Sequence, residues 1–205
     1  LGTEHKEVLL TPEEALDIIP KIAKTYGEPF ADSSQIATMA VCAMASQYMS
    51  AVLTGDGADE VFGGYNRYIW APRIWKWKGI IPLSFGHAIS NLLLRTPHKR
   101  LKGFQVYLNN ISKTPQITEK LFKVGWALNS KSKSELYHNL VTGNSGIEFV
   151  KNHSPSYLSE NYEKLIEESK HMAMAMMEVD MNTYLPDDIL VKVDRASMWH
   201  GLETR

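Results

Sequence analysis

The sequence predicts an α/β front portion followed by a mostly α-helical back portion, so that the protein is rich in helix overall. Apolar residues recur at helical spacing through the first 48 residues, a short apolar segment with strand character follows, and a glycine-rich acidic loop ends it. Beyond this loop the pattern suits helices, and no convincing strand appears again. We therefore expect a front portion over residues 1–64 and a helical portion over residues 65–205.

The first helix is expected to run from Pro12 to about Tyr26. Thr11 offers a hydroxyl cap, proline suits the first helical position, and Glu14 lies three residues after the cap, which is the pattern of a capping box. The Gly-Glu-Pro sequence at residues 27–29 is expected to end this helix.

The next elements of the front portion lead into the acidic loop. The Asp-Ser-Ser sequence at residues 32–34 predicts the cap of a second helix, rich in alanine and methionine, that continues to about Tyr48. Residues 49–54 then read as a short buried strand, and residues 55–60 form the turn that ends it.

The back portion is expected to consist of helices separated by loops. Helical patterns cover residues 65–77, 83–94, 134–141 and 157–171, and loops are marked by proline and glycine at residues 95–103 and 144–156. A last helix, with Asp187 or Asp188 as its cap, is expected to run towards Met198.

Composition excludes several classes of protein. Of the 205 residues, 44% are hydrophobic, and 22 basic residues balance 23 acidic ones, which leaves a net charge of −1 and no field that favours nucleic acid or an anionic membrane. No apolar run reaches the roughly 18 residues that a membrane span needs. The single cysteine, Cys42, excludes an intrachain disulfide, and its apolar surroundings predict a buried, inert thiol. We expect a soluble cytoplasmic protein.

The strongest chemical signal is the acidic loop. Asp56, Asp59 and Glu60 lie within five residues, and glycines beside them let the backbone approach a ligand closely. Such a cluster of hard oxygen ligands suits Mg²⁺ that bridges the phosphates of a nucleotide. The alternative is that these acids only begin the next helix, where negative charge complements the helix dipole.

A second signal lies near the end of the chain. Lys192 and Arg195 are three residues apart and hence on one helical face, with Asp194 to the side, so that the two cations suit phosphate or carboxylate oxygens. The alternative is a solvated face on which Asp194 and Arg195 pair locally, an arrangement that contributes little to stability.

Three blocks of the sequence resemble the synthetase domain of the glutamine-dependent asparagine synthetases. Residues 53–65, Leu-Thr-Gly-Asp-Gly-Ala-Asp-Glu-Val-Phe-Gly-Gly-Tyr, resemble the family signature, with threonine in place of the commoner serine. Residues 184–205 resemble a later block of the same family, and residues 28–34, Glu-Pro-Phe-Ala-Asp-Ser-Ser, are a third match in the right order. The three blocks span nearly the whole chain.

The resemblance implies a fold and a reaction. The fold would be part of a parallel sheet like that of the adenine nucleotide α-hydrolases. ATP would activate the side-chain carboxylate of aspartate as an acyl-adenylate with release of pyrophosphate, and ammonia made from glutamine would then attack it. The resemblance implies that Thr54, Gly55 and Gly57 contact the nucleotide and that Asp59 is the Mg²⁺ ligand. It also implies that Asp56 organises the activated aspartate. Weaker support for the substrate site comes from Glu60, Lys192, Asp194 and Arg195.

Other parts of the family pattern are missing from residues 1–205. They contain no Ser-Gly-Gly-x-Asp-Ser pyrophosphate loop and no glutaminase domain with an initial cysteine, and they stop before the Val-Pro-Phe-Leu-Asp sequence. We therefore expect an internal portion of a synthetase that neither hydrolyses glutamine nor forms an acyl-adenylate by itself. A homodimer of the longer protein is a further expectation.

Two competing readings remain at this point. A β-lactam-forming synthetase shares the activation step, although the intact run at residues 59–65 disfavours it. The other reading is a non-catalytic helical interaction domain with an aromatic surface made of Tyr65, Tyr68, Trp70, Trp75 and Trp77.

Overall fold

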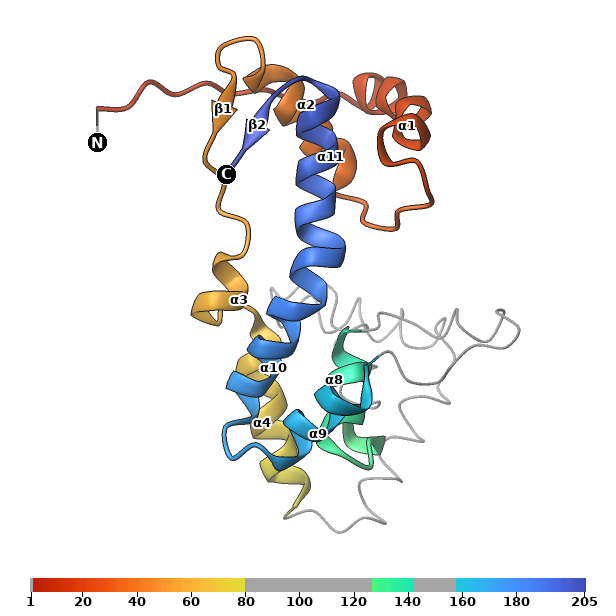
Figure 1. Cartoon of the computed structure of the whole chain (residues 1–205), viewed down its shortest axis with the longest axis vertical. Coiled ribbons are helices and arrows are strands. Elements are labelled where there is room, and N and C mark those ends of the chain that lie inside the picture. Colours follow the sequence, from red (N-terminus) through yellow and green to blue (C-terminus); the bar gives the residue numbers. More distant parts are fainter. Residues whose placement is uncertain (1, 80–126, 142–157) are drawn as a thin grey trace, which may run out of the picture. The chain divides into compact units, whose positions relative to one another are not determined.

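A computed structural model describes residues 2–79, 127–141 and 158–205 (Figure 1). The chain divides into two compact units, one of Leu1–Phe62 with Val179–Arg205 and the other of Gly63–Glu178. The end of the chain therefore packs with the front portion, whereas the sequence grouped it with the helices; the division into domains stays a prediction. The helix expected at residues 83–94 and the loops at 95–103 and 144–156 lie outside the described residues.

Helix α1 (Pro12–Tyr26) has the bounds that its local signals predict. The amide of Thr11 donates to Oε2 of Glu14 over 2.9 Å, and the amide of Glu14 donates to Oγ1 of Thr11 over 3.2 Å, so the capping box is complete. Gly27 ends the helix with a left-handed φ of 75°. Its expected bounds are confirmed.

Helix α2 (Gln35–Ala45) follows where it was expected but ends three residues earlier, since Tyr48 lies in a turn. Ser34 is the N-cap residue, yet its side chain makes no capping hydrogen bond. The amide of Ser34 instead donates to Oδ1 of Asp32 over 2.8 Å, which turns the chain just before the helix begins.

A two-stranded parallel sheet joins the two stretches of chain that make up the first unit. Strand β1 (Ala51–Val52) pairs with β2 (Glu203–Thr204), and Ala51 lies opposite Glu203 (Figure 1). The expectation of a buried strand over residues 49–54 was wrong in length and burial, because the strand has two residues and the next residue, Leu53, is 87% exposed. The expectation of no later strand was also wrong.

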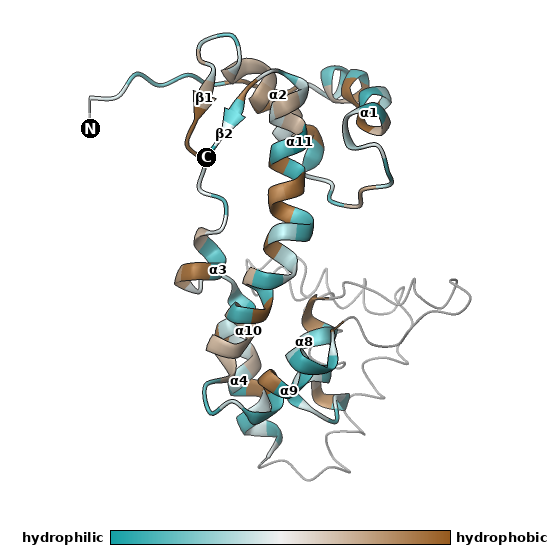
Figure 2. Ribbon diagram, viewed as in Figure 1, coloured by the Kyte–Doolittle hydropathy of each residue, from teal (hydrophilic) through white to brown (hydrophobic). Residues whose placement is uncertain are grey.

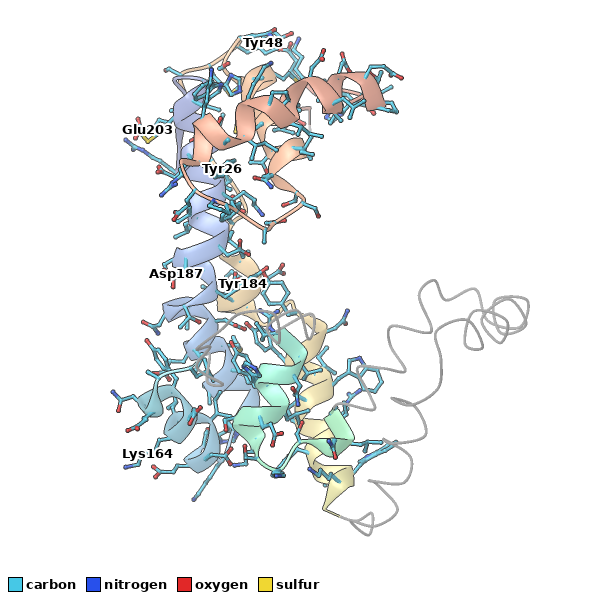
Figure 3. All side chains as sticks on the ribbon, turned by 90° about the vertical axis from the view of Figure 1, so that its right-hand side faces the viewer. Tyr26, Tyr48, Lys164, Tyr184, Asp187 and Glu203 are labelled. Atoms are coloured by element: carbon cyan, nitrogen blue, oxygen red, sulfur yellow. The ribbon has the colours of Figure 1, made fainter. Side chains whose placement is uncertain are left out.

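The segment before the last helix is a wide helical turn. Helix α10 (Met172–Asn182) is followed by a π-helical turn, η2 (Leu185–Leu190), and by α11 (Val191–Trp199). Asp187, labelled in Figure 3, lies within η2, as does Asp188, so neither residue is the predicted cap. Pro186 has no amide hydrogen to donate, and one extra residue in this turn accommodates it.

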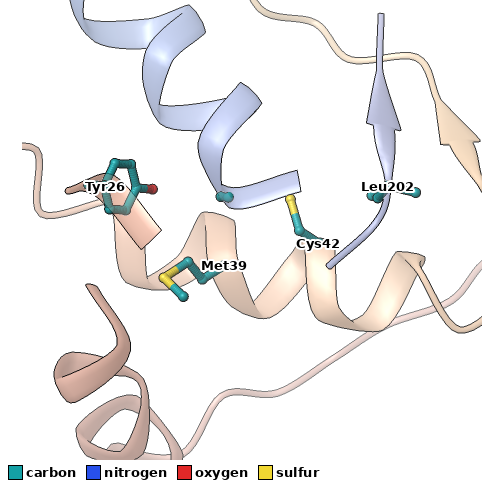
Figure 4. Packing of buried hydrophobic residues seen from close by; sticks show 5 residues of the cluster. Tyr26, Met39, Cys42 and Leu202 are labelled. Atoms are coloured by element: carbon teal, nitrogen blue, oxygen red, sulfur yellow. The ribbon is translucent and has the colours of Figure 1, made fainter. Parts of the chain in front are cut away.

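The core of the first unit forms where α11 meets the two early helices. It consists of Tyr26, Met39, Cys42, Ala196 and Leu202 (Figure 4). The ring of Tyr26 also stacks on Phe30, with centroids 4.9 Å apart. Helix α11 carries both hydrophobic and hydrophilic residues (Figure 2), and its buried residues Val193, Ala196 and Ser197 are three and four positions apart, which is the spacing of a helix that packs on one face. Helix α11 is therefore anchored to α1 and α2.

The regular structure among the described residues of the second unit is helical. They include α4 (Asn66–Lys78), α8 (Lys133–Val141), α9 (Glu160–Glu168) and most of α10. The helices expected near 65–77 and 134–141 are confirmed, and the one expected at 157–171 is shorter. Within α4, Tyr68 is buried whereas Trp77 is 68% exposed. Among the described residues, no helix has the length and apolar character needed to cross a membrane.

Candidate functional site

The acidic loop begins at a hydrogen-bonded junction between the two parallel strands. The amide of Thr54 donates to the carbonyl oxygen of Arg205 over 2.8 Å, and the amide of Arg205 donates to the carbonyl oxygen of Val52 over 2.9 Å. The pairing thus continues past the last residues of both strands. Thr54 and Gly55 lie two and three residues after the carboxyl end of β1, and both are exposed.

The three acidic side chains of the loop do not gather at one point. Asp59 and Glu60 lie in the first turn of the five-residue helix α3 (Ala58–Phe62), where Asp59 is exposed and Glu60 is buried. Asp56 is exposed in the turn before this helix. Within the described ranges, no group of three acidic, histidine or cysteine side chains has the geometry of a metal site. Asp59 and Glu60 do begin a helix, as the alternative interpretation expects, whereas Asp56 lies before it.

Gly57 holds the loop in a conformation that other residues rarely adopt. Its φ is 85°, and a Cβ atom added there would lie 3.5 Å from both methyl carbons of Leu185. The loop therefore passes close to the first residue of η2. A side chain at this position would require a left-handed backbone, whereas its Cβ atom would only be in ordinary van der Waals contact with the leucine.

Lys192 is bound to the segment between α1 and α2. Its Nζ atom lies 2.7 Å from Oδ2 of Asp32 and 2.9 Å from Oγ of Ser34. The side chains of Lys192 and Asp32 are only 14% and 21% exposed. In addition, the hydroxyl of Tyr26 donates to the carbonyl oxygen of Lys192 over 3.2 Å. The residues that meet here are about 160 positions apart in the sequence.

Arg195 makes a second and more exposed ion pair on the same face. Its Nη2 atom lies 3.4 Å from Oε1 of Glu28. The expectation that Lys192 and Arg195 share a face is confirmed, and both meet carboxylate oxygens. The alternative of a local pair with Asp194 is wrong, because Arg195 pairs with Glu28 and Asp194 is exposed.

The charges around Lys192 shift the pKa values of two carboxyl groups in opposite directions. Burial alone would raise the pKa of Asp32, but the hydrogen bonds from Lys192 and Ser34 outweigh it, and the pKa lies below its ordinary value. Burial and the charge of Asp32 raise the pKa of Asp188, and these effects exceed the opposing influence of Lys192 and of a hydrogen bond from Tyr184. The charge of Lys192 therefore acts on the carboxyl groups of both Asp32 and Asp188. Asp32 lies in direct contact with Lys192.

An open depression lies beside α11 and β2. It has a volume of about 400 Å³, and its lining consists of Asp194, Ser197, Met198, Gly201, Leu202, Glu203 and Thr204. Ser197 is buried, and its Oγ atom donates to the carbonyl oxygen of Asp194 over 2.9 Å and lies 3.3 Å from Oγ1 of Thr204. Of the residues singled out from the sequence, only Asp194 lines this depression.

Comparison with known proteins decides the family. A family model described as asparagine synthase matches residues 1–205. The chain belongs to the asparagine synthase family. It is 27% identical to asparagine synthetase [glutamine-hydrolyzing] 1 of Bacillus subtilis over 216 residues, which cover the whole chain and 30% of that relative. No solved structure was found to match it.

Two shorter matches agree with this assignment. A putative asparagine synthetase [glutamine-hydrolyzing] 2 of Methanocaldococcus jannaschii is 39% identical over 67 residues, which are 33% of the chain and 13% of the relative. A putative asparagine synthetase of Mycobacterium tuberculosis is 34% identical over 68 residues, or 33% of the chain and 10% of the relative. The chain thus spans less than a third of the length of each of these relatives.

Contacts within the first unit connect the three blocks that resemble asparagine synthetases. The block at residues 28–34 supplies Glu28, Asp32 and Ser34 to the cations of α11, and the end of the last block pairs with the start of the loop at Thr54. Sequence reasoning gave the residues of the 28–34 block no role in the site beyond ending the first helix and capping the second. Its similarity to the family was the signal that marked them, but nothing local identified Lys192 as their partner.

Proposed function

We propose that the protein is an ATP-dependent ligase that converts aspartate to asparagine with ammonia derived from glutamine. The observation that carries this proposal is the hydrogen bond from Thr54 to Arg205, which fixes the glycine-rich acidic loop at the carboxyl end of a parallel strand. Ligands of open α/β sheets bind at such ends. Membership of the asparagine synthase family and relatives named as glutamine-hydrolysing asparagine synthetases support the same activity.

The first step of the proposed reaction activates aspartate. A carboxylate is a poor acyl donor, so an oxygen of the aspartate side chain attacks the α-phosphorus of ATP, and the bond from that phosphorus to pyrophosphate breaks. Ammonia then attacks the carbonyl carbon of the acyl-adenylate, and AMP leaves with the oxygen that came from aspartate. Glutamine supplies the ammonia through a glutaminase activity, and each turnover forms one asparagine, AMP and pyrophosphate.

Exposed groups of the loop suit the nucleotide in this scheme. We assign contacts with ATP to Thr54, Gly55 and Gly57, since the exposed backbone at Thr54 and Gly55 leaves room for phosphates to approach and Gly57 is half-buried just beyond it. Asp56 is assigned to the organisation of the activated aspartate. Glu60 is buried in the first turn of α3, so its assigned role is to support the substrate site from beneath.

A divalent cation would be held mainly by Asp59. Mg²⁺ is usually bound by one or two carboxylates together with phosphate oxygens and water, so it does not need a cage of three protein ligands. Asp59 fits this requirement, because its side chain is exposed at the loop and is free to meet a metal-bound phosphate. When bound, the cation would offset the charge that develops on the departing pyrophosphate.

We further propose that the first unit is part of a sheet like that of the adenine nucleotide α-hydrolases. The parallel pairing of β1 and β2 supports this assignment, because their register and direction suit a sheet whose strands all run the same way. Lys192, Asp194 and Arg195 support the substrate site from α11 in this arrangement. The 205 residues alone are expected to form no acyl-adenylate.

Isotope transfer tests the proposed reaction in the full-length protein. With aspartate labelled with ¹⁸O in its side-chain carboxylate, we expect one labelled oxygen in AMP for each asparagine formed. Pyrophosphate should accumulate in equal amount. Formation of ADP and inorganic phosphate instead would show activation through an acyl-phosphate, and amide formation within one substrate without ammonia would favour a β-lactam-forming enzyme.

A further inference from the structure

Lys192 occupies the centre of a charged cluster that the proposed reaction does not use directly. Its Nζ atom contacts Asp32 over 2.7 Å and Ser34 over 2.9 Å, and Asp188 is close enough for Lys192 to influence the pKa of its carboxyl group. The contact with Asp32 is largely shielded from solvent. A pair that has given up most of its hydration needs its partner, so removal of either charge leaves the other poorly satisfied.

A second set of contacts attaches the same segment to the same helix. Arg195 pairs with Glu28, and the hydroxyl of Tyr26 donates to the carbonyl oxygen of Lys192. Tyr26 is itself fixed by its stacking on Phe30. The segment between α1 and α2 therefore holds α11 through side chains at both ends, whereas the interior of the contact is apolar core.

Residues 202–205 connect helix α11 to the acidic loop. The amide of Leu202 donates to the carbonyl oxygen of Ser197 over 2.9 Å, which ties the turn after α11 back to the helix. Strand β2 follows directly, and the carbonyl oxygen of Arg205 accepts from the amide of Thr54. An unbroken run of contacts thus leads from Asp32 through Lys192 and β2 to Thr54.

We propose that Lys192 is a positioning residue for the nucleotide loop: its ion pair with Asp32 fixes α11, and α11 fixes Thr54 through β2. This inference rests on the proposed function, since it assigns Thr54 and the following glycines to ATP. Lys192 itself does not touch the substrate in this scheme. Its loss shifts the groups that do.

Kinetics of the full-length protein test this role. Lys192→Met is expected to raise the KM for ATP about tenfold while kcat changes by less than about twofold, because a displaced loop loses contacts that bind ATP equally well in the ground state and the transition state. Asp32→Asn should give the same change, and the double variant should be no worse than either single one, since both remove one interaction. Lys192→Arg keeps a cation and should recover most of the affinity.

Glutaminase activity and an exposed lysine provide the controls. The KM for glutamine should be unchanged in every variant. Lys164 pairs with Glu168 over 3.8 Å on α9, where both side chains are about 70% exposed, and Lys164→Met should leave the KM for ATP unchanged. If Lys192→Met does not fold, Asp32→Asn carries the same test with a smaller change of shape.

The outcomes separate this inference from the proposed function. A Lys192→Met or Asp32→Asn protein with a lower melting temperature and a lower kcat but an unchanged KM for ATP would show a purely structural role and overturn the inference. Additive effects of the two substitutions would overturn it as well. If the wild-type protein forms no asparagine from aspartate and ATP, the proposed function fails, and the positioning role falls with it.

Discussion

The amide of Thr54 donates a hydrogen bond to the carbonyl oxygen of Arg205 over 2.8 Å, so the start of the acidic loop depends on a residue of strand β2's continuation. The two residues are about 150 positions apart, and a parallel pair of strands brings them together. Removal of Glu203 to Arg205 would therefore leave the amide of Thr54 without its acceptor. The loop would lose its attachment to α11.

Substitution of Asp59 tests the proposed metal ligand. Asp59→Asn should weaken the binding of Mg²⁺-ATP by at least about tenfold, because a charged oxygen ligand is replaced by a neutral one. Its side chain is exposed, so the melting temperature should not change. Titration calorimetry measures the affinity. Asp17→Asn, which removes an exposed carboxylate from α1, is the control, and equal losses in both variants would exclude a specific role for Asp59.

Two glycines of the loop should respond differently to alanine. Gly57 has a φ of 85°, so Gly57→Ala should destabilise the protein by about 1–2 kcal/mol, the cost of left-handed backbone for a residue with a Cβ atom. Gly55 has no positive φ and open space around it. Gly55→Ala should therefore leave chemical denaturation unchanged and weaken only the binding of Mg²⁺-ATP. An equal loss of stability in both variants would contradict this division.

The raised pKa of Asp188 predicts a substitution that stabilises the protein. A carboxyl group with a higher pKa in the folded state than in the unfolded state disfavours folding as pH rises above the unfolded-state pKa, and the penalty is complete above the folded-state pKa. Asp188→Asn should therefore raise the melting temperature at pH 7 by about 2 °C. At pH 3, where the carboxyl group is protonated in both states, no gain is expected.

Calorimetry at the two pH values checks this prediction. Asp187→Asn is the matched control, since Asp187 is the exposed neighbour of Asp188 on the same turn. It should change the melting temperature at neither pH. A gain in Asp188→Asn that is the same at pH 3 and pH 7 would show that side-chain shape, and not ionisation, is responsible.

The lowered pKa of Asp32 predicts the opposite pH dependence. A carboxyl group with a lower pKa in the folded state contributes stability above its unfolded value, and this contribution is lost as pH falls through the folded-state pKa, that is, below about pH 4. Lys192→Met removes the main partner of Asp32, so the variant should lose less stability than the wild type over this acid range. Urea denaturation at several pH values measures the free energy of unfolding of both proteins. Equal losses of stability in the variant and the wild type over this acid range would refute the pairing.

Cys42 should react slowly with thiol reagents. Burial and the charge of Asp56 raise its pKa, so little thiolate exists at pH 8, and the side chain is only 5% exposed. Its modification by a coloured disulfide reagent should be far slower in native protein than in urea. Fast labelling of the native protein would show that the core between α2 and α11 opens readily.

Local signals account for the parts of the fold that the sequence predicted well. Helix α1 has its predicted bounds because the capping box, the proline and Gly27 all lie within the helix or next to it. Strand β2 was missed because two residues, Glu203 and Thr204, carry no alternating pattern, and their partner lies about 150 residues earlier. Asp187 and Asp188 look like caps in sequence, but the chain before them is already helical.

The candidate site shows the same limit. Clustered acids beside glycines marked the acidic loop, and helical spacing placed Lys192 and Arg195 on one face. Family resemblance then assigned roles to these residues. The choice of Asp32 and Glu28 as their partners depends on the packing of α11 against α1 and α2, which no local pattern encodes. Likewise, Glu60 is buried and Asp59 is exposed because the two side chains lie on different faces of α3, and the sequence does not show which face packs against the protein.

The discontinuous first unit has a consequence for protein synthesis. A ribosome makes residues 1–62 before the 116 residues that separate them from Val179, a delay of about 6 to 23 seconds at ordinary elongation rates. During that interval the apolar faces of α1 and α2 have no α11 to cover them. Nascent chains are thus most vulnerable to aggregation then, and a holding chaperone would act on this stretch.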